Sequence, residues 1–298
     1  MKRIRIFSMA LCIVASITFF VYLYTTRQIM DNDGPEISMD SDIIEISVTD
    51  DSSAILEGVT ARDNRDGDTT EYLLVEQLTN FIEKGRRQAT IAAFDEAGNV
   101  TKEVREVVYT DYESPKFALS EPLSFPTNSN SVVRFISAYD CLDGDISVFI
   151  KLSSEEGISL TTEGLYQAMF TVSNSAGDTA TLPVTVEIYN SSERSRKPNI
   201  VLSDYLVYVE KDAAFNARSY IEEVYYGNRS YEKEADGLLH YSGSAYYSNT
   251  MPETISYSEF DIENPVDTSV PGVYEVVYSY SWEESDPGTT RLIVVVTE

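Results

Sequence analysis

Two groups of aspartates in this sequence have the type and spacing to bind a divalent cation. Each group lies in the same phrase, Ala-x-Asp-x-x-Asp-Gly-Asp, which occupies residues 61–68 and again residues 138–145. The acids are Asp63, Asp66 and Asp68 in the first copy, and Asp140, Asp143 and Asp145 in the second. Calcium takes about six to eight oxygen ligands, so three carboxylates on one turn supply part of such a site.

The same phrase also has a purely structural interpretation, which we favour. Gly67 and Gly144 permit the positive φ of a tight turn, and aspartates beside them can bond to the local backbone. The order of the acids also differs from that of an EF-hand loop. The sequence therefore predicts turns at residues 63–68 and 140–145 that need no cofactor, with calcium binding at these turns as the alternative.

Groups that could carry out catalysis are scarce. His240 is the one histidine of the chain, so a histidine-based triad could be built only around it. The sequence has no nucleophile elbow, no His-Glu-x-x-His motif and no glycine-rich phosphate loop. A paired-carboxylate hydrolase stays open in a chain with 49 Asp and Glu, but acids spread along strands are typical of a solvated surface. We expect no catalytic residues and no enzyme activity.

The charge balance limits the partners that the protein can have. The formal net charge is −27, from 22 Lys and Arg against 49 Asp and Glu, so the surface repels nucleic acid. A hydrophobic content of 43% is enough to build folded cores. Cys12 lies in the apolar N-terminal segment, which leaves Cys141 without a partner in its own domain. We expect no nucleic-acid partner and no disulfide.

The N-terminal segment predicts a transmembrane helix. Residues 6–26 carry no charge, and as a helix they would span about 31 Å, close to the roughly 30 Å of a bilayer core. Lys2, Arg3 and Arg5 precede the run and acids follow it, so residues 1–5 should form a cytoplasmic tail. A cleaved signal peptide is the alternative, although its apolar region is normally shorter, about 7–15 residues.

Recurring signals divide the rest of the chain into three units. Each unit opens on a proline (Pro35, Pro115 and Pro198), and each later has a glycine followed by an alternating apolar run at residues 89–93, 168–172 and 276–280. A turn then leads into the last strands, predicted at residues 100–109, 179–188 and 290–296. The predicted domains are residues 35–112, 113–190 and 198–298. The linkers are residues 27–34 and the polar, basic segment 191–197, which we expect to be mobile.

Short strands at regular spacing without a helical period predict β-sandwiches. In the second and third units the glycine leads to Tyr166 and Tyr274, an arrangement typical of the tyrosine corner of immunoglobulin folds. The first unit has Arg87 at this place, so its corner should be less stable or closed differently. The predicted fold class is all-β, with three tandem immunoglobulin-like sandwiches after one N-terminal helix.

The combination of Pro-x-Ile/Phe, Ala-x-Asp-x-x-Asp-Gly-Asp, Gly-x-Tyr and Ala-Gly-Asn resembles the bacterial immunoglobulin-like (Big-type) repeats of surface proteins. The resemblance covers residues 35–190 well. Over residues 198–298 it rests on the opening strand and the final hairpin. It implies an envelope-exposed module that serves as a spacer, as part of an adhesin or as a ligand-binding accessory.

The third unit departs from the repeat by a tyrosine-rich insertion at residues 220–257. Tyrosine together with Ser, Gly and Asn is typical of adaptable binding loops, and aromatic faces suit sugars and protein hot spots. The structural alternative is an extra hairpin whose tyrosines cover a sheet face. The candidate ligand-binding residues are Tyr225, Tyr226, Tyr231, Tyr241, Tyr246 and Tyr247.

These features predict a single-pass membrane protein whose C-terminal bulk is extracellular and presents immunoglobulin-like domains for adhesion or ligand binding. Its partners would be the membrane, through the N-terminal helix, and a surface glycan or protein, through the third domain. Two alternatives stay open. One is a carbohydrate-binding accessory module beside a surface enzyme, and the other is a structural spacer or assembly subunit.

Overall fold

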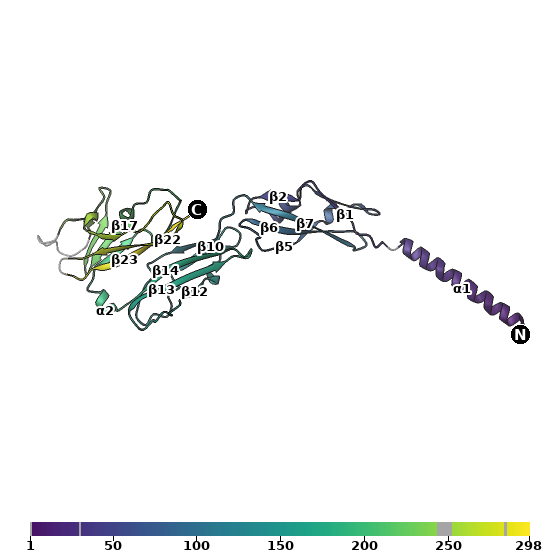
Figure 1. The fold of residues 1–298 in the computed structure, drawn as a ribbon, viewed down its shortest axis with the longest axis horizontal. Helices are drawn as coiled ribbons and strands as arrows, with labels where there is room; N and C mark the ends of the chain where they lie inside the picture. Colours follow the sequence, from purple (N-terminus) through teal and green to yellow (C-terminus); the bar gives the residue numbers. More distant parts are fainter. Residues whose placement is uncertain (1, 30, 243–251, 283–284) are drawn as a thin grey trace. The chain divides into compact units, whose positions relative to one another are not determined.

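The structure, a computed structural model, describes residues 2–29, 31–242, 252–282 and 285–298. It consists of two compact units, residues 1–112 and residues 113–298. The first unit holds an N-terminal helix and one β-sandwich, and the second holds two further sandwiches (Figure 1). The described chain therefore has the predicted all-β architecture with one apolar N-terminal helix.

The N-terminal helix is α1 (Lys2–Ile29), and its side chains at residues 5–25 are exposed. Its segment from Arg5 to Thr25 is long and apolar enough to cross a membrane, and none of it is buried against the protein. The hydroxyls of Ser16 and Thr25 donate to carbonyl oxygens one turn earlier, so these polar groups are satisfied inside the helix. The helix thus fits a membrane anchor or a signal sequence.

The first sandwich combines a three-stranded and a four-stranded sheet. The order of the first sheet is β1 (Glu36–Met39), β3 (Val59–Asp63) and β4 (Gly67–Asp68). The order of the second is β2 (Ile43–Ile46), β7 (Val100–Tyr109), β6 (Arg86–Phe94) and β5 (Leu74–Leu78), and the short 3-10 helices are η1 (Ser52–Leu56) and η2 (Thr70–Tyr72). Strand β2 runs parallel to β7, so the chain crosses from one sheet to the other directly after its opening strand.

The second sandwich repeats this strand order. Its first sheet contains β8 (Lys116–Leu119), β10 (Ile136–Asp140) and β11 (Gly144–Asp145), which is followed by η3 (Ser147–Phe149). Its second sheet contains β9 (Ser124–Pro126), β14 (Thr179–Tyr189), β13 (Gly164–Ser173) and β12 (Lys151–Ser153). Strand β9 again runs parallel to the last strand, so the two sandwiches are copies of one fold.

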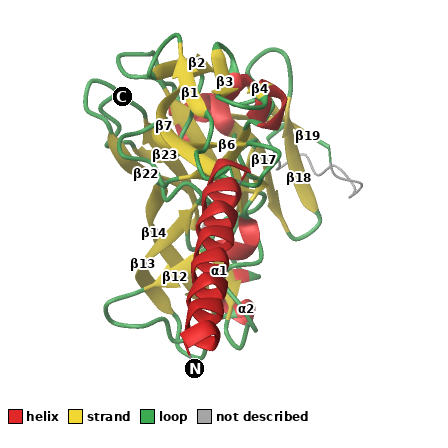
Figure 2. Ribbon diagram, turned by 90° about the vertical axis from the view of Figure 1, so that its right-hand side faces the viewer, coloured by secondary structure: helices red, strands yellow, loops and turns green. Residues whose placement is uncertain are grey.

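The third sandwich keeps the second sheet and enlarges the first. Its four-stranded sheet contains β16 (Leu206–Val209), β23 (Gly288–Val296), β22 (Gly272–Tyr280) and β21 (Asp261–Glu263). Its five-stranded sheet contains β15 (Asn199–Leu202), β17 (Ile221–Tyr226), β18 (Arg229–Lys233), β19 (Leu238–Tyr241) and β20 (Thr254–Ser256), flanked by η4 (Ala217–Tyr220) and η5 (Tyr257–Glu259). The insertion at residues 220–257 therefore supplies strands, and Figure 2 shows β18 and β19 beside β17.

The predicted alternating runs are the inward rows of the three sandwiches. These residues are all buried: Ala89, Ile91 and Ala93 in β6, Ala168, Phe170 and Val172 in β13, and Val276, Tyr278 and Tyr280 in β22. The third core is the most aromatic, and its buried hydroxyls need partners. Tyr278, whose pKa is raised by burial, donates to the carbonyl oxygen of Ala217 at 2.7 Å.

The tyrosine corner is present where the sequence predicts it. The hydroxyls of Tyr166 and Tyr274 each donate to the backbone carbonyl oxygen four residues earlier, at 2.8 Å in both cases. In the first sandwich Arg87 donates to the hydroxyl of Tyr109 instead. Its guanidinium carbon lies 5.1 Å from the centre of that ring and 5.9 Å from the centre of the Phe81 ring. The first corner is thus closed by cation–π contacts.

The second and third sandwiches are packed together. Ile293 on β23 is buried among the core residues of the second sandwich. Between the sandwiches the chain forms a short helix, α2 (Ser191–Arg194). The Arg194 guanidinium donates to Asn199 Oδ1 at 3.2 Å and to the carbonyl oxygen of Thr289 at 3.4 Å. The predicted linker thus contacts the strand that follows it and also Thr289, a contact that its local composition does not reveal.

Candidate functional site

The repeated aspartate phrase forms a tight turn in both copies. Asp63 Oδ1 accepts hydrogen bonds from the backbone N–H groups of Arg65 and Asp66, at 2.6 and 3.0 Å. In the second copy, Asp140 Oδ1 accepts from the two equivalent N–H groups. The bonds from the Asp66 and Arg65 backbone hold the pKa of Asp63 below its usual range. The turn interpretation thus accounts for one oxygen of each aspartate.

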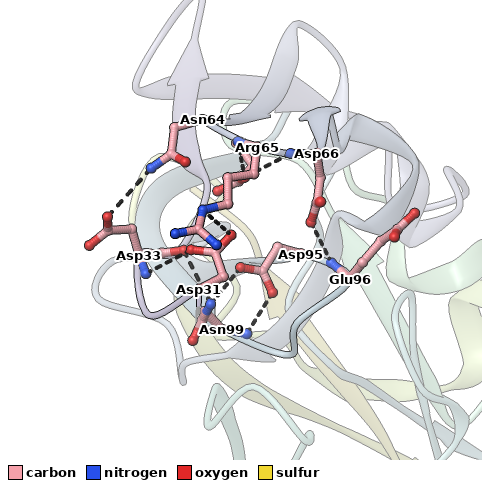
Figure 3. Close-up of polar contacts among 9 residues, drawn as sticks. Asp31, Asp33, Asn64, Arg65, Asp66, Asp95, Glu96 and Asn99 are labelled. Carbon is pink, nitrogen blue, oxygen red and sulfur yellow. Dashed lines mark hydrogen bonds and ion pairs between the residues drawn. The ribbon is translucent and has the colours of Figure 1, made fainter. Parts of the chain in front are cut away.

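In the first sandwich, Asp63 also belongs to a cluster of three carboxylates (Figure 3). The other two members are Asp31, which precedes β1, and Asp95, in the turn between β6 and β7. One carboxylate oxygen from each residue lies within 4.8 Å of the others. Asp63 and Asp95 are only 3% and 7% exposed. We call these three residues the carboxylate cluster.

Hydrogen bonds and one ion pair hold the carboxylate cluster in place. The backbone N–H and the side-chain amide of Asn99 donate to the two oxygens of Asp95, both at 2.7 Å. The same amide donates to the carbonyl oxygen of Asp33 at 3.2 Å, and the N–H of Asp33 donates to Asp31 Oδ1 at 3.3 Å. On the other side, Arg65 Nε lies 3.6 Å from Asp31 Oδ2.

The other acids of the repeated phrase do not join the cluster. Asp66 Oδ2 accepts from the N–H of Glu96 at 2.9 Å, and Asp68 Oδ1 accepts from the N–H of Thr70 at 3.0 Å. In the second copy, Asp143 accepts a hydrogen bond from the N–H of Ser175, and Asp145 accepts one from the N–H of Ser147. Asp66 therefore connects its turn to the turn between β6 and β7, and Asp68 bonds locally, so neither contributes an oxygen to the cluster.

Tyr231, one of the six candidate tyrosines, lies in the core of the third sandwich. Its side chain is fully buried, and its hydroxyl donates to the carbonyl oxygen of Pro252 at 2.8 Å. Its ring centre lies 5.1 Å from that of Trp282 and 5.4 Å from that of Tyr241. Tyr231 therefore stabilises the core and offers no surface to a ligand.

The remaining candidates differ in exposure. Tyr226 and Tyr241 are half-buried and pack against the same core. Tyr225 is 41% exposed and points outward. Tyr246 and Tyr247 lie outside the described residues. Among the described candidates, Tyr225 thus offers the most surface.

Tyr225 lies on the outward face of the five-stranded sheet. The strand register places it opposite Ser230 on β18 and Asn199 on β15. Glu223 accepts a hydrogen bond from the hydroxyl of Ser230, and Glu232 accepts one from the hydroxyl of Ser242. This face combines an aromatic ring with hydroxyl, amide and carboxylate groups, and we call it the outer face of the third sandwich.

The chain's one histidine lies in the same sheet, on β19, which pairs with both β18 and β20. His240 Nε2 and Asp236 Oδ2 are 2.8 Å apart across the turn that joins β18 and β19. The hydrogen bond to Asp236 raises the pKa of His240, and the bond from His240 lowers the pKa of Asp236. Asp236 Oδ1 also accepts from the N–H of Leu238 at 3.0 Å. The pair thus ties the turn to the strand that follows.

A groove of about 390 Å³ lies where the second sandwich meets α2 and β23. Its apolar wall includes Leu165 and Tyr189. Its charged groups are three cations and three acids: Arg194, Lys197, Arg291, Glu163, Glu187 and Glu193. The guanidinium carbon of Arg194 lies 5.2 Å from the centre of the Tyr189 ring. The volume is within the range of small-molecule sites. Sequence analysis did not find this groove, whose only local signal was the basic segment at residues 191–197.

Comparison with known proteins does not assign a family. No protein-family model and no curated protein matches the sequence. One similar solved structure, from Clostridium perfringens, joins a catalytic domain to CBM51 domains (11% identity, 88% of this chain, 31% of that chain, TM-score 0.22). A second is the protocadherin GammaB4 extracellular domain (14% identity, 90% of this chain, 50% of that chain, TM-score 0.20). A third is a Bacteroides thetaiotaomicron lipoprotein (12% identity, 60% of this chain, 98% of that chain, TM-score 0.23).

The chain thus spans less than a third of the first of these structures and half of the second. At these identities and scores the similarities carry no conclusion about activity. The immunoglobulin-like sandwich follows from the chain's own strand order, which the first two domains share in full and the third keeps in its four-stranded sheet.

Proposed function

We propose that this protein is a non-catalytic, single-pass membrane protein of a bacterial surface, related to the Big-type repeats, that presents its sandwiches for adhesion or ligand binding. Residues 6–26 anchor the chain, residues 1–5 stay in the cytoplasm and the sandwiches lie outside. The third sandwich carries the recognition surface, and its ligand is a surface glycan or a protein.

The observation that carries this proposal is the enlarged sheet of the third sandwich. The equivalent sheets of the first two sandwiches have three strands, whereas this one has five. The added strands extend the outer face, where Tyr225 is 41% exposed beside hydrogen-bonding side chains. An aromatic ring with adjacent small polar groups is the composition of adaptable recognition surfaces.

The groove beside α2 supports a second candidate function, that of a carbohydrate-binding accessory module. Leu165 and Tyr189 supply an apolar wall. Lys197 supplies donors and Glu163 and Glu193 supply acceptors for the hydroxyl groups of a sugar. A groove between two packed sandwiches is also a preferred place for a ligand.

Protease treatment of intact cells tests the orientation. An N-terminal epitope tag and a tag after residue 298 would be followed together by immunoblotting. We expect loss of the C-terminal tag, a protected N-terminal fragment and, before protease, one band that carries both tags. A C-terminal tag that resists protease in intact cells, or an N-terminal tag missing before treatment, contradicts the anchored orientation.

Binding assays with the full-length protein in lipid nanodiscs test recognition. The probes are a glycan array and a panel of extracellular matrix proteins. Tyr225→Ala should weaken binding at least tenfold if the outer face is the site. Tyr72→Ala is the matched control, because Tyr72 on the first sandwich is 43% exposed.

The groove has its own variant, Leu165→Glu, which places a charge on the apolar wall at an exposed position. Glycan binding that is lost in this variant and kept in Tyr225→Ala would favour the accessory-module function. Absence of binding to every probe would contradict both functions and favour a structural spacer.

A further inference from the structure

One oxygen of Asp63 is left without a partner in the carboxylate cluster. Only 3% of the surface of Asp63 is exposed. Its Oδ1 accepts hydrogen bonds from the backbone N–H groups of Arg65 and Asp66. Oδ2 is buried and has no hydrogen-bond partner among the described residues. A buried carboxylate oxygen of this kind requires a compensating positive charge or a donor.

The second sandwich shows where Oδ2 of Asp63 points and how the same turn is satisfied without an ion. Asp140 occupies the place of Asp63, and Asn174 opens the hairpin turn where the first copy has Asp95. The amide of Asn174 donates to Asp140 Oδ2 at 3.1 Å. By this equivalence, Oδ2 of Asp63 points toward Asp95, a second carboxylate that cannot donate.

Asp31, the third carboxylate of the cluster, has a sequence equivalent in Asp111, whose oxygens are both hydrogen-bonded. Asp111 stands four residues before Pro115, as Asp31 stands four residues before Pro35. Asp111 accepts from the hydroxyl of Ser47 at 2.7 Å and from a backbone N–H at 2.8 Å. Both oxygens of Asp111 thus have donors inside the first sandwich, whereas Asp63 Oδ2 has none among the described residues.

Arg65 balances part of this charge. Its Nε lies 3.6 Å from Asp31 Oδ2, and its side chain is 41% exposed. This ion pair supplies one positive group beside a cluster of three carboxylates, two of which are almost fully buried. The cluster retains a net negative charge that a divalent cation can neutralise.

We propose that Asp31, Asp63 and Asp95 bind a calcium ion. Oxygens that share one calcium at about 2.4 Å lie no more than about 4.8 Å apart, which is the spacing found here. The ligand atoms are all carboxylate oxygens, which suit a hard cation with flexible coordination better than zinc. The carbonyl oxygen of Asp33 and the side chain of Asn99 border the cluster and can add ligands.

This ion would join the segment that follows the membrane helix to the first sandwich. Asp31 is two residues beyond the end of α1, whereas Asp63 and Asp95 belong to turns of the sandwich. Calcium would therefore fix residues 31–34 to the folded domain. The proposal does not rest on the ligand surface of the third sandwich.

Calcium titration of the full-length protein in nanodiscs tests the proposal. By isothermal calorimetry we expect one site per chain with a dissociation constant of about 10⁻⁴ to 10⁻³ M, the range of extracellular modules. Asp95→Asn should weaken binding at least tenfold and still fold, because it copies the pairing of Asn174 with Asp140. Glu156→Gln, which removes an exposed acid of the second sandwich, is the matched control.

Thermal unfolding gives a second readout. EDTA should lower the unfolding midpoint of the wild type and of Glu156→Gln, and it should leave Asp95→Asn unchanged. The proposal is overturned if the wild type shows no calcium heat and the same midpoint in EDTA and calcium, since Arg65 would then balance the cluster alone. Equal affinity in the wild type and Asp95→Asn, or for magnesium and calcium, would overturn it as well.

Discussion

The hydroxyl of Tyr208 accepts a hydrogen bond from the backbone N–H of Phe117 at 2.8 Å, and this contact joins β16 of the third sandwich to β8 of the second. The bond is partly buried, and burial raises the pKa of Tyr208. Two sandwiches that share such bonds lose stability together when one of them is disturbed. Residues 113–298 should therefore unfold as one cooperative unit.

Tyr208→Phe removes the acceptor and leaves the N–H of Phe117 without a partner. We expect a loss of about 1–3 kcal/mol in the free energy of unfolding, measured by urea titration. Tyr225→Phe, which removes a hydroxyl from an exposed ring, should change it by less than about 0.5 kcal/mol. Equal effects of the two variants would show that the interface bond contributes nothing.

Ile293→Ala should destabilise both sandwiches of this unit. Ile293 is 4% exposed and lies in the hydrophobic core of the second sandwich, although its strand belongs to the third. Truncation of a buried isoleucine costs about 2–5 kcal/mol. Hydrogen exchange should become faster in β13 and β22 alike, whereas Val148→Ala, at a position 85% exposed, should change neither. Faster exchange in β22 alone would contradict the shared core.

Strand positions were predictable from the sequence, since alternation and turn residues are local signals. The last strand of the first sandwich was expected at residues 100–109, and β7 spans Val100–Tyr109. The turn before it carries the Ala-Gly-Asn phrase, which reverses the chain. The tyrosine corners of Tyr166 and Tyr274 are confirmed for the same reason, because four residues separate donor and acceptor.

Contacts between distant segments could not be predicted. Asp63 was expected in a turn, but its neighbours Asp31 and Asp95 come from two other segments. Tyr225 and Tyr231 look alike in the sequence, and only the pairing of β17 with β18 turns one outward and the other into the core. A shift of one residue in strand register exchanges the two faces, so composition cannot separate them.

The pair of His240 and Asp236 predicts a pH-dependent hairpin. The pKa of His240 is raised above 6.5. The stability that its ion pair gives to the hairpin is therefore complete below that pH and is lost as the pH rises through the raised pKa. The pKa of Asp236 is lowered from 3.8, so its contribution is complete above that pH and is lost as the pH falls through the lowered value. The hairpin should be best protected between pH 3.8 and 6.5.

Proton NMR checks this directly, because the chain has one histidine and its ring signals are unambiguous. The titration midpoint of His240 should lie above 6.5 in the wild type and should fall in Asp236→Asn. Amide exchange in β18 and β19, corrected for intrinsic rates, should be faster at pH 8 than at pH 6. A midpoint that Asp236→Asn does not change would exclude the pair as the cause.

Arg105 is a buried arginine that holds the end of the 3-10 helix η1 in the first sandwich. Its side chain is 2% exposed, and Nη1 donates to the carbonyl oxygens of Ile55 and Glu57 at 2.7 and 2.6 Å. Arg105→Met would leave both acceptors unpaired and should lower the free energy of unfolding by about 2–4 kcal/mol. Amides of η1 should exchange faster than the rest of the sandwich. Lys102→Met is the control on the same strand, because that lysine forms an exposed ion pair worth about 0–1 kcal/mol. If both variants lose the same stability, the two hydrogen bonds from Arg105 to carbonyl oxygens do not stabilise η1.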